Sequence, residues 1–232
     1  MEPPQGARFY AEPLLLLPGI GTRYALPELP PAAPRSAFGL SDQTRLYLNP
    51  QSLFKVHPDN DALVCELMRR DPEGVFLFFR DPSERKTRQF ADRLARAMHE
   101  QGIAPRGQVK FLPRSDPLGF RALMQMADVV LDTQHWSGGN TALDALACGV
   151  PLVTLPGEFM RGRQSAAMLR AMGLDELVAG SSEDYLASAL HLAAAPGERE
   201  RLRTLMHERR GAVFDRPEAI AELAQLLEER AN

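Results

Sequence analysis

Short apolar runs alternate with longer amphipathic segments through most of this 232-residue chain. The clearest run, Val75–Phe79, contains no polar residue, which is typical of a strand buried on both faces of a parallel sheet. The next segment, 83–100, places Phe90, Leu94 and Met98 on one face of a helix and arginines on the other. Strands separated by helices of this length form βαβ units. The alternation predicts an α/β fold, a doubly wound Rossmann-like parallel sheet with flanking helices and a helical C-terminal tail.

The same patterns set the order of the expected elements. We expect strands at 46–48, 75–79, 109–112, 129–131, 151–155 and 177–178. We expect helices at 59–70, 83–100, 118–126, 141–147, 163–172, 182–194, 198–209 and 217–230.

The first forty residues differ from the rest, because eight of the 19 prolines lie in them. Each proline ring removes an amide donor and restricts the residue before it, which disfavours both helix and central strand. We therefore divide the chain into a proline-rich arm or interdomain linker at 1–40 and an α/β domain with C-terminal helices at 41–232. A simple N-terminal tail is the alternative for the arm.

Charge and composition exclude several classes of function. The net charge of −3 and the pI of about 6.0 argue against a dedicated nucleic-acid-binding protein. The longest apolar run, 14–17, is far shorter than the ~20 residues of a membrane span, and no secretion signal is visible. Cys65 and Cys148 lie in apolar helical settings, as expected in a reducing compartment. We expect a soluble cytoplasmic protein with no nucleic-acid or membrane partner.

The loop after the fourth expected strand has the strongest chemical signal. It contains adjacent glycines, Gly138 and Gly139, and a helix opens at Asn140 or Thr141. Ligands of doubly wound sheets bind at the carboxyl ends of the strands, and free amides at a helix start attract phosphate. Asp144, one turn into the helix, is placed to bind a ribose diol. The alternative is that Thr141 and Asp144 form a capping box with no ligand.

Three further groups have two interpretations each. Lys55 follows the first strand and is either a phosphate-neutralising cation or a solvated surface lysine. Asp59 and Asp61 have the spacing of a carboxylate pair that holds a divalent metal, but acidic residues at a helix start are the favoured interpretation. His135 and Trp136 either line a pocket or serve packing.

Five segments occur in the order and spacing of a known family: 53–58, 127–133, 138–146, 149–158 and 172–179. Over about 45–180 the chain resembles the C-terminal catalytic half of the O-linked N-acetylglucosamine transferase or SPINDLY-like family, glycosyltransferase family 41. The resemblance implies that 41–232 is the nucleotide-sugar-binding, C-terminal domain of a GT-B fold. It also implies that the arm links the two halves of the catalytic region.

The resemblance assigns roles residue by residue. Lys55 matches the lysine that contacts the donor diphosphate and stabilises the departing nucleotide, so it is the expected catalytic residue. Gly139, Asn140 and Thr141 match the helix start that binds the diphosphate, where the family often has His-Thr-Thr. Asp144 matches the acidic residue that binds the ribose.

The expected base site departs further from the family. Ser115 matches a position whose main chain reads the base. Phe120 stands where the animal enzymes carry a histidine stacked on uracil, and Pro117 where they carry a ribose-contacting lysine. Gly138 completes the expected binding set. These departures leave both the base and the sugar open, since relatives use GDP-fucose as well as UDP-sugars.

The function implied by the resemblance is protein O-glycosylation, with N-acetylglucosamine transferred from UDP-GlcNAc to serine or threonine. The implied partners are a nucleotide sugar, a protein acceptor, the N-terminal GT-B half and tetratricopeptide repeats. We expect no metal and no other cofactor, because a lysine and helix amides can offset the charge of the leaving diphosphate. We expect this chain to be inactive without the N-terminal half. The alternatives are a non-catalytic nucleotide- or protein-binding module and a GT-B-shaped nucleotide-sugar epimerase.

Overall fold

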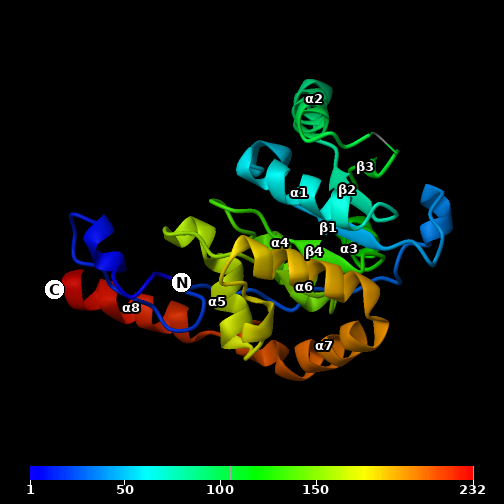
Figure 1. Cartoon of the computed structure of the whole chain (residues 1–232). Coiled ribbons are helices and arrows are strands. Elements are labelled where there is room, and N and C mark those ends of the chain that lie inside the picture. The colour runs from blue at the N-terminus through cyan, green and yellow to red at the C-terminus, as the bar shows by residue number, and fades with distance from the viewer. Residues whose placement is uncertain (105, 232) are drawn as a thin grey trace.

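A parallel sheet of five strands forms the centre of the protein (Figure 1). The computed structural model describes residues 1–104 and 106–231. The strands are β1 (Leu46–Asn49), β2 (Val75–Phe79), β3 (Val109–Leu112), β4 (Val129–Leu131) and β5 (Leu152–Val153). Their order is β3-β2-β1-β4-β5, so the direction of winding reverses between β1 and β4. The predicted doubly wound sheet is confirmed, and its carboxyl ends at this switch point are where such sheets bind ligands.

Helices cover both faces of the sheet. The α-helices are α1 (Asp59–Arg70), α2 (Glu84–Glu100), α3 (Pro117–Met124), α4 (Asn140–Ala147), α5 (Gln164–Ala171), α6 (Ser182–Ala194), α7 (Pro196–Arg209) and α8 (Glu218–Ala231). The 3₁₀ turns are η1 (Gly6–Phe9), η2 (Arg35–Phe38), η3 (Leu53–Lys55), η4 (Met160–Gly162), η5 (Asp175–Leu177) and η6 (Arg210–Ala212). Contacts group α1 with α2 and α6, and α3 with α4. Within residues 1–104 and 106–231, no helix has the length and apolar character that a membrane span needs.

The expected elements agree with the structure to within two residues at each end, with one correction. The strand expected at 177–178 is wrong. The segment forms the turn η5, and Val178 makes only an isolated parallel bridge to Thr154. Thr154 accepts a bond from the amide of Ala179 (2.8 Å) and donates one to the carbonyl of Leu177 (3.1 Å). The extended stretch is short because a 3₁₀ turn precedes it and the capping residue of α6, Ser181, follows it.

The core of the sheet is apolar and aromatic. Tyr47, Phe76 and Phe78 are at most 1% exposed, and the ring of Tyr47 stacks on that of Phe76 with centroids 4.7 Å apart. Burying a side chain of this size contributes about 1.5–3 kcal/mol. The uninterrupted apolar run of β2 therefore has the two-sided burial that its sequence predicts.

The proline-rich arm is extended and lies against the domain. Ile20 is buried, and the amide of Ala33 donates to the carbonyl of Ala122 at 2.8 Å. The arm meets the core again at Arg35, whose guanidinium donates to the Asp128 carboxylate at 3.0 Å. The arm is therefore ordered by specific contacts, while its role as a linker between two halves stays a prediction.

Asp128 joins three parts of the fold. Its buried carboxylate accepts hydrogen bonds from Arg35 in the arm (3.0 Å) and from the amide of Leu46 in β1 (2.8 Å), and it pairs with Arg199 in α7 at 3.0 Å. Two guanidinium groups and one amide compensate the cost of burying this charge.

A second buried carboxylate, Asp71, fixes the entry to β1. It accepts hydrogen bonds from Arg45 and from the hydroxyl of Tyr47, both at 2.7 Å. Burial by itself would raise the pKa of Asp71, but the hydrogen bonds from Arg45 and Tyr47 outweigh it and the pKa is lowered. The ionised form of Asp71 therefore stabilises the fold.

We predict that Asp71→Asn lowers the free energy of unfolding at neutral pH by about 1–3 kcal/mol, because Arg45 and Tyr47 lose their charged acceptor. Asp71 stabilises the fold fully above the unfolded carboxyl pKa of about 3.9 and loses this effect as the pH falls towards its lower folded value. In urea unfolding, the difference between wild type and variant should shrink between about pH 5 and pH 3. Glu200→Gln, which breaks an exposed pair with Arg203, is the control and should cost less than about 1 kcal/mol. An equal difference at both ends of this pH range would contradict the prediction.

Candidate functional site

A cavity of about 710 Å³ opens at the carboxyl ends of the strands. The segments that follow β1, β2 and β3 form its walls, together with α3 and α4. Four residues of the expected site line it: Ser115, Phe120, Thr141 and Asp144. Residues far apart in sequence thus meet at the position that the topology favours for a ligand.

The glycine pair forms the start of α4. Gly138 lines a small hollow beside the cavity together with Thr141, and a Cβ atom at Gly138 would lie 2.8 Å from Thr141 Oγ1. Gly139 is the N-cap of the helix and makes no side-chain capping bond. In the described part of the chain, no group accepts a hydrogen bond from the amides of Gly139, Asn140 or Thr141. The helix start therefore presents free amides, and the capping-box alternative for Thr141 and Asp144 is wrong.

Asp132 holds this glycine turn, and the sequence analysis did not assign it a role. Its buried carboxylate accepts a hydrogen bond from the amide of Gly138 and another from the hydroxyl of Thr154, both at 2.7 Å. Tyr185 in α6 donates to the backbone carbonyl of Asp132 at 2.9 Å. Burial raises the pKa of Asp132, while the bonds from Thr154 and Gly138 oppose the rise. The sequence did contain a signal for this role, because Asp132 directly follows a buried strand and precedes Gly138 by six positions.

Asp144 lines the cavity from the first turns of α4 and is 8% exposed. Arg121 in α3 lies 3.4 Å from its Oδ1 atom and also donates to the carbonyl of Glu28 in the arm at 2.9 Å. Burial raises the pKa of Asp144, and the charge of Arg121 opposes that rise. Arg121 is a second residue that sequence reasoning missed, since one arginine in an amphipathic helix carries no distinctive signal.

Phe120 and Ser115 lie on the side of α3. The ring of Phe120 packs against Phe79, with centroids 4.7 Å apart, and borders the cavity. Asp116 caps α3 by accepting a hydrogen bond from the amide of Gly119 at 2.8 Å, and Pro117 occupies the first helical position. The start of α3 is thus conventionally capped, and an aromatic surface is available for stacking at the cavity wall.

Lys55 ends the turn η3 and lies beside, not on, the wall of the cavity. Its ammonium group is 5.1 Å from the centre of the Trp136 ring and 5.9 Å from that of Phe54. No carboxylate of residues 1–104 or 106–231 lies within ion-pair distance of this ammonium group. Trp136 is 43% exposed and faces Lys55, so it is not a core residue. Aromatic rings hold a cation in place without neutralising it.

The carboxylate pair at the start of α1 does not form a metal site. Asp61 accepts two hydrogen bonds from Arg93, at 2.7 and 2.9 Å, and is buried. Burial raises the pKa of Asp61, and the bonds from Arg93 oppose the rise. The interpretation of Asp59 and Asp61 as a metal-binding pair is therefore wrong, because Arg93 occupies both carboxylate oxygens of Asp61.

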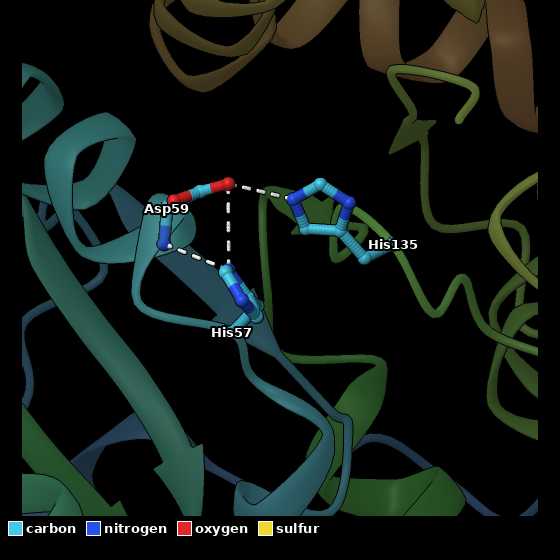
Figure 2. A group of neighbouring side chains, drawn as sticks. All are labelled: His57, Asp59 and His135. Atoms are coloured by element: carbon cyan, nitrogen blue, oxygen red, sulfur yellow. Dashed lines mark hydrogen bonds and ion pairs between the residues drawn. The ribbon is translucent and has the colours of Figure 1, made fainter. Parts of the chain in front are cut away.

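Asp59 instead joins two histidines (Figure 2). His135 Nε2 lies 2.7 Å and His57 Nδ1 3.4 Å from the same Asp59 oxygen, Oδ2. The hydrogen bond from His135 is the main cause of a lowered pKa of Asp59. Sequence reasoning treated these residues separately, because they come from different loops.

Two curated relatives each match about two thirds of the chain. A UDP-N-acetylglucosamine–peptide N-acetylglucosaminyltransferase of Caenorhabditis elegans is 27% identical over 158 residues, which are 68% of this chain and 13% of the worm protein. The Arabidopsis thaliana protein named "Probable UDP-N-acetylglucosamine–peptide N-acetylglucosaminyltransferase SEC" is 30% identical over 162 residues, which are 68% of this chain and 16% of the plant protein. The matches thus span less than a fifth of either relative.

A solved structure and a family model extend the match to most of the chain. A mutant O-GlcNAc transferase of Thermobaculum terrenum superposes with a TM-score of 0.79 and 29% identity, over 98% of this chain and 42% of that one. The sheet and its helices thus have the arrangement of a GT-B glycosyltransferase domain. The model described as "Glycosyl transferase family 41" matches residues 21–218. The chain therefore belongs to glycosyltransferase family 41.

Proposed function

We propose that this chain is the donor-binding half of a protein O-glycosyltransferase that transfers N-acetylglucosamine from UDP-GlcNAc to serine or threonine. One observation carries the proposal: the uncapped start of α4 opens beside a cavity that Asp144 and Phe120 line. A diphosphate fits the free amides, a ribose fits the carboxylate, and a base fits the aromatic ring. The names of the relatives supply the donor and the acceptor class.

The chemistry of transfer explains the need for positive charge at this place. The bond from the sugar carbon to the diphosphate oxygen breaks, and its electron pair stays on the diphosphate. The acceptor oxygen forms the new bond to that carbon and loses its proton. Lys55 and the amides of Gly139 to Thr141 would stabilise the charge that develops on the leaving group. Because these groups supply the compensation, the proposal needs no metal on the diphosphate.

The nucleoside half of the donor would occupy the cavity. Asp144 would accept the ribose hydroxyls, Phe120 would stack on the base, and the main chain at Ser115 would read the edge of the base. Pro117 and Gly139 differ from the family pattern, so a GDP-sugar such as GDP-fucose is the alternative donor. The volume of about 710 Å³ leaves room for a nucleotide of either kind.

The acceptor would bind to a second domain. The chain matches 42% of the solved transferase and smaller fractions of the curated relatives. We propose that the arm at 1–40 connects this domain to the N-terminal half of the catalytic region, which would carry the acceptor contacts. The two free, buried cysteines, Cys65 and Cys148, support a cytoplasmic location.

Nucleotide binding is the first test of the proposal. UDP at 100 times its dissociation constant should stabilise the fold by about 2.7 kcal/mol, which raises the melting temperature measurably. The same shift is expected with excess EDTA and with Mg²⁺, because Lys55 and helix amides provide the charge. A thermal-shift panel of UDP, GDP, UDP-GlcNAc and GDP-fucose would rank the donors. If none of the four moves the melting curve at millimolar concentration, the site assignment fails.

The ribose role of Asp144 makes a separate prediction. Asp144→Asn should weaken UDP binding at least tenfold, since a hydrogen bond to a charged group contributes about 1.5–3 kcal/mol. The variant should also melt at a lower temperature, because the largely buried Arg121 loses its charged partner. UDP binding is therefore measured well below the melting temperature of the variant. Asp175→Asn, at an exposed pair with Arg170, is the matched control and should bind UDP normally. Isothermal titration calorimetry measures both variants. Normal UDP binding by Asp144→Asn would contradict the proposal that Asp144 binds the ribose.

Transfer should require the second half. The isolated chain should bind UDP-GlcNAc but glycosylate no acceptor, because positioning of the acceptor is worth several kcal/mol of the barrier. Fusion to the N-terminal half of a family-41 enzyme should restore transfer, which radiolabelled UDP-GlcNAc measures. In that fusion Lys55→Ala should reduce the rate by at least about 100-fold, as for loss of one stabilising donor, and leave the melting temperature unchanged. Robust transfer by the isolated chain would overturn the proposal of a divided site.

A further inference from the structure

Two histidines and one aspartate converge outside the nucleotide cavity (Figure 2). One ligand atom of each of His57, Asp59 and His135 lies within 4.8 Å of the other two, and all three side chains are exposed. His57 and Asp59 belong to the segment that leads into α1, and His135 belongs to the loop after β4. Figure 2 shows the two imidazole rings directed at the same carboxylate from these two segments.

The buried side chain of Asn60 fixes the backbone on both sides of the cluster. Its Oδ1 atom accepts a hydrogen bond from the amide of Gln134 at 2.9 Å, and its Nδ2 group donates to the carbonyl of His57 at 3.2 Å. Asn60 is 3% exposed. The residues that carry the two rings are therefore held together even without a bond between the rings and Asp59.

His135 has a backbone conformation that residues other than glycine rarely adopt, with φ at 65°. The amide of the neighbouring Trp136 donates a hydrogen bond to the carbonyl of Gln134 at 2.7 Å. The carbonyl of Trp136 accepts one from the hydroxyl of Thr133 at 2.6 Å. The loop is thus a tight turn, and this turn directs the imidazole of His135 towards Asp59. A site whose ligands are held by the surrounding chain binds a metal with a smaller loss of conformational entropy.

The chemistry of the three ligand atoms selects the kind of ion. Two imidazole nitrogens and one carboxylate oxygen suit Zn²⁺ and the neighbouring transition metals, whereas Mg²⁺ prefers oxygen atoms alone. Zinc bonds of about 2.0–2.2 Å require the ligand atoms to lie around a common centre. Tetrahedral zinc with such bonds places its ligand atoms roughly 3.3 Å apart. The 3.4 Å between His57 Nδ1 and Asp59 Oδ2 fits this spacing, and rotation of the exposed side chains would open the 2.7 Å hydrogen bond between His135 and Asp59.

We propose that His57, Asp59 and His135 bind a divalent transition metal, with Zn²⁺ as the fitting ion. The metal would replace the hydrogen bond between His135 and Asp59 and the one that His57 Nδ1 accepts from the amide of Asp59 at 3.3 Å. Its ligands would be neutral imidazoles and an ionised carboxylate. Its remaining coordination positions would face solvent. This departs from the expectation, drawn from the sequence, that the chain holds no metal. The proposal does not rest on nucleotide binding, because the ion and the nucleotide use different residues.

Metal binding tests the proposal directly on the full chain without an affinity tag. Co²⁺ titration should give visible absorption bands of a low-coordinate site, and calorimetry should show Zn²⁺ binding with a stoichiometry of one. Mg²⁺ in excess should displace neither ion. The absence of saturable Zn²⁺ binding at micromolar concentration would overturn the proposal and leave the cluster as a hydrogen-bonded contact between two loops.

Variants distinguish Zn²⁺ binding at this cluster from Zn²⁺ binding at other histidines of the chain. His135→Asn keeps a residue that tolerates the positive φ, and Asp59→Asn removes the charge without changing the shape. Each should weaken Zn²⁺ binding at least about 100-fold, since changes beyond the ligands of a metal site already cost about 10–100-fold. His99→Ala, in α2, is the matched control and should bind Zn²⁺ as the wild type does. Melting curves without metal establish that each variant folds. Equal Zn²⁺ binding by His135→Asn and His99→Ala would overturn the proposal.

Discussion

The buried carboxylate of Asp132 is the interaction on which the geometry of the candidate site depends. It lies at the end of β4, beside the point where the winding of the sheet reverses, and it binds the amide of Gly138 and the hydroxyl of Thr154. The first bond sets the path of the chain into α4, and the second ties that path to the end of β5. A buried amide without an acceptor costs about 1–3 kcal/mol, so conformations of the turn that leave the amide of Gly138 unbonded are less stable by about that amount. The free amides at the start of α4 therefore stand in a fixed place.

The two sides of the cavity reach their positions by different means. The start of α4 is held from within the sheet by Asp132, whereas Arg121 in α3 ties Asp144 to the arm through the carbonyl of Glu28. The arm therefore takes part in the support of the site. A change at the arm would act on Asp144 through Arg121, without any contact between the arm and a ligand.

The sequence allowed the strands, the helices and a doubly wound parallel sheet to be predicted, because hydrophobic periodicity is a local property of each element. The strand order, and with it the position of the switch point, came from the structure. The short run at 177–178 was misjudged, since two apolar residues form a strand only when a partner of sufficient length is available. Four expected site residues meet at one cavity because the carboxyl ends of parallel strands converge. The long-range side-chain pairs near this edge of the sheet were not predictable in the same way. Arg93 with Asp61, and His135 with Asp59, are separated by 32 and 76 positions, and periodicity carries no information about such pairs.

Three features at the carboxyl end of the sheet bear on the two proposed ligands. No side chain caps α4, as is also true of α1, α2, α5 and α7, whereas Asp116 caps α3 and Ser181 caps α6. Lys55 faces two aromatic rings where a surface lysine would face solvent or a carboxylate, and His135 has a positive φ. The positive φ of His135 is a strained conformation, and the two rings leave the charge of Lys55 without a counter-ion. The buried carboxylates Asp71 and Asp128, in contrast, are paired with arginines. An anion at α4 and Lys55 would satisfy the first two, and a cation at His135 would stabilise the third. In these two proposals the ligands have opposite charges and contact different residues, so neither would compete with the other for its site.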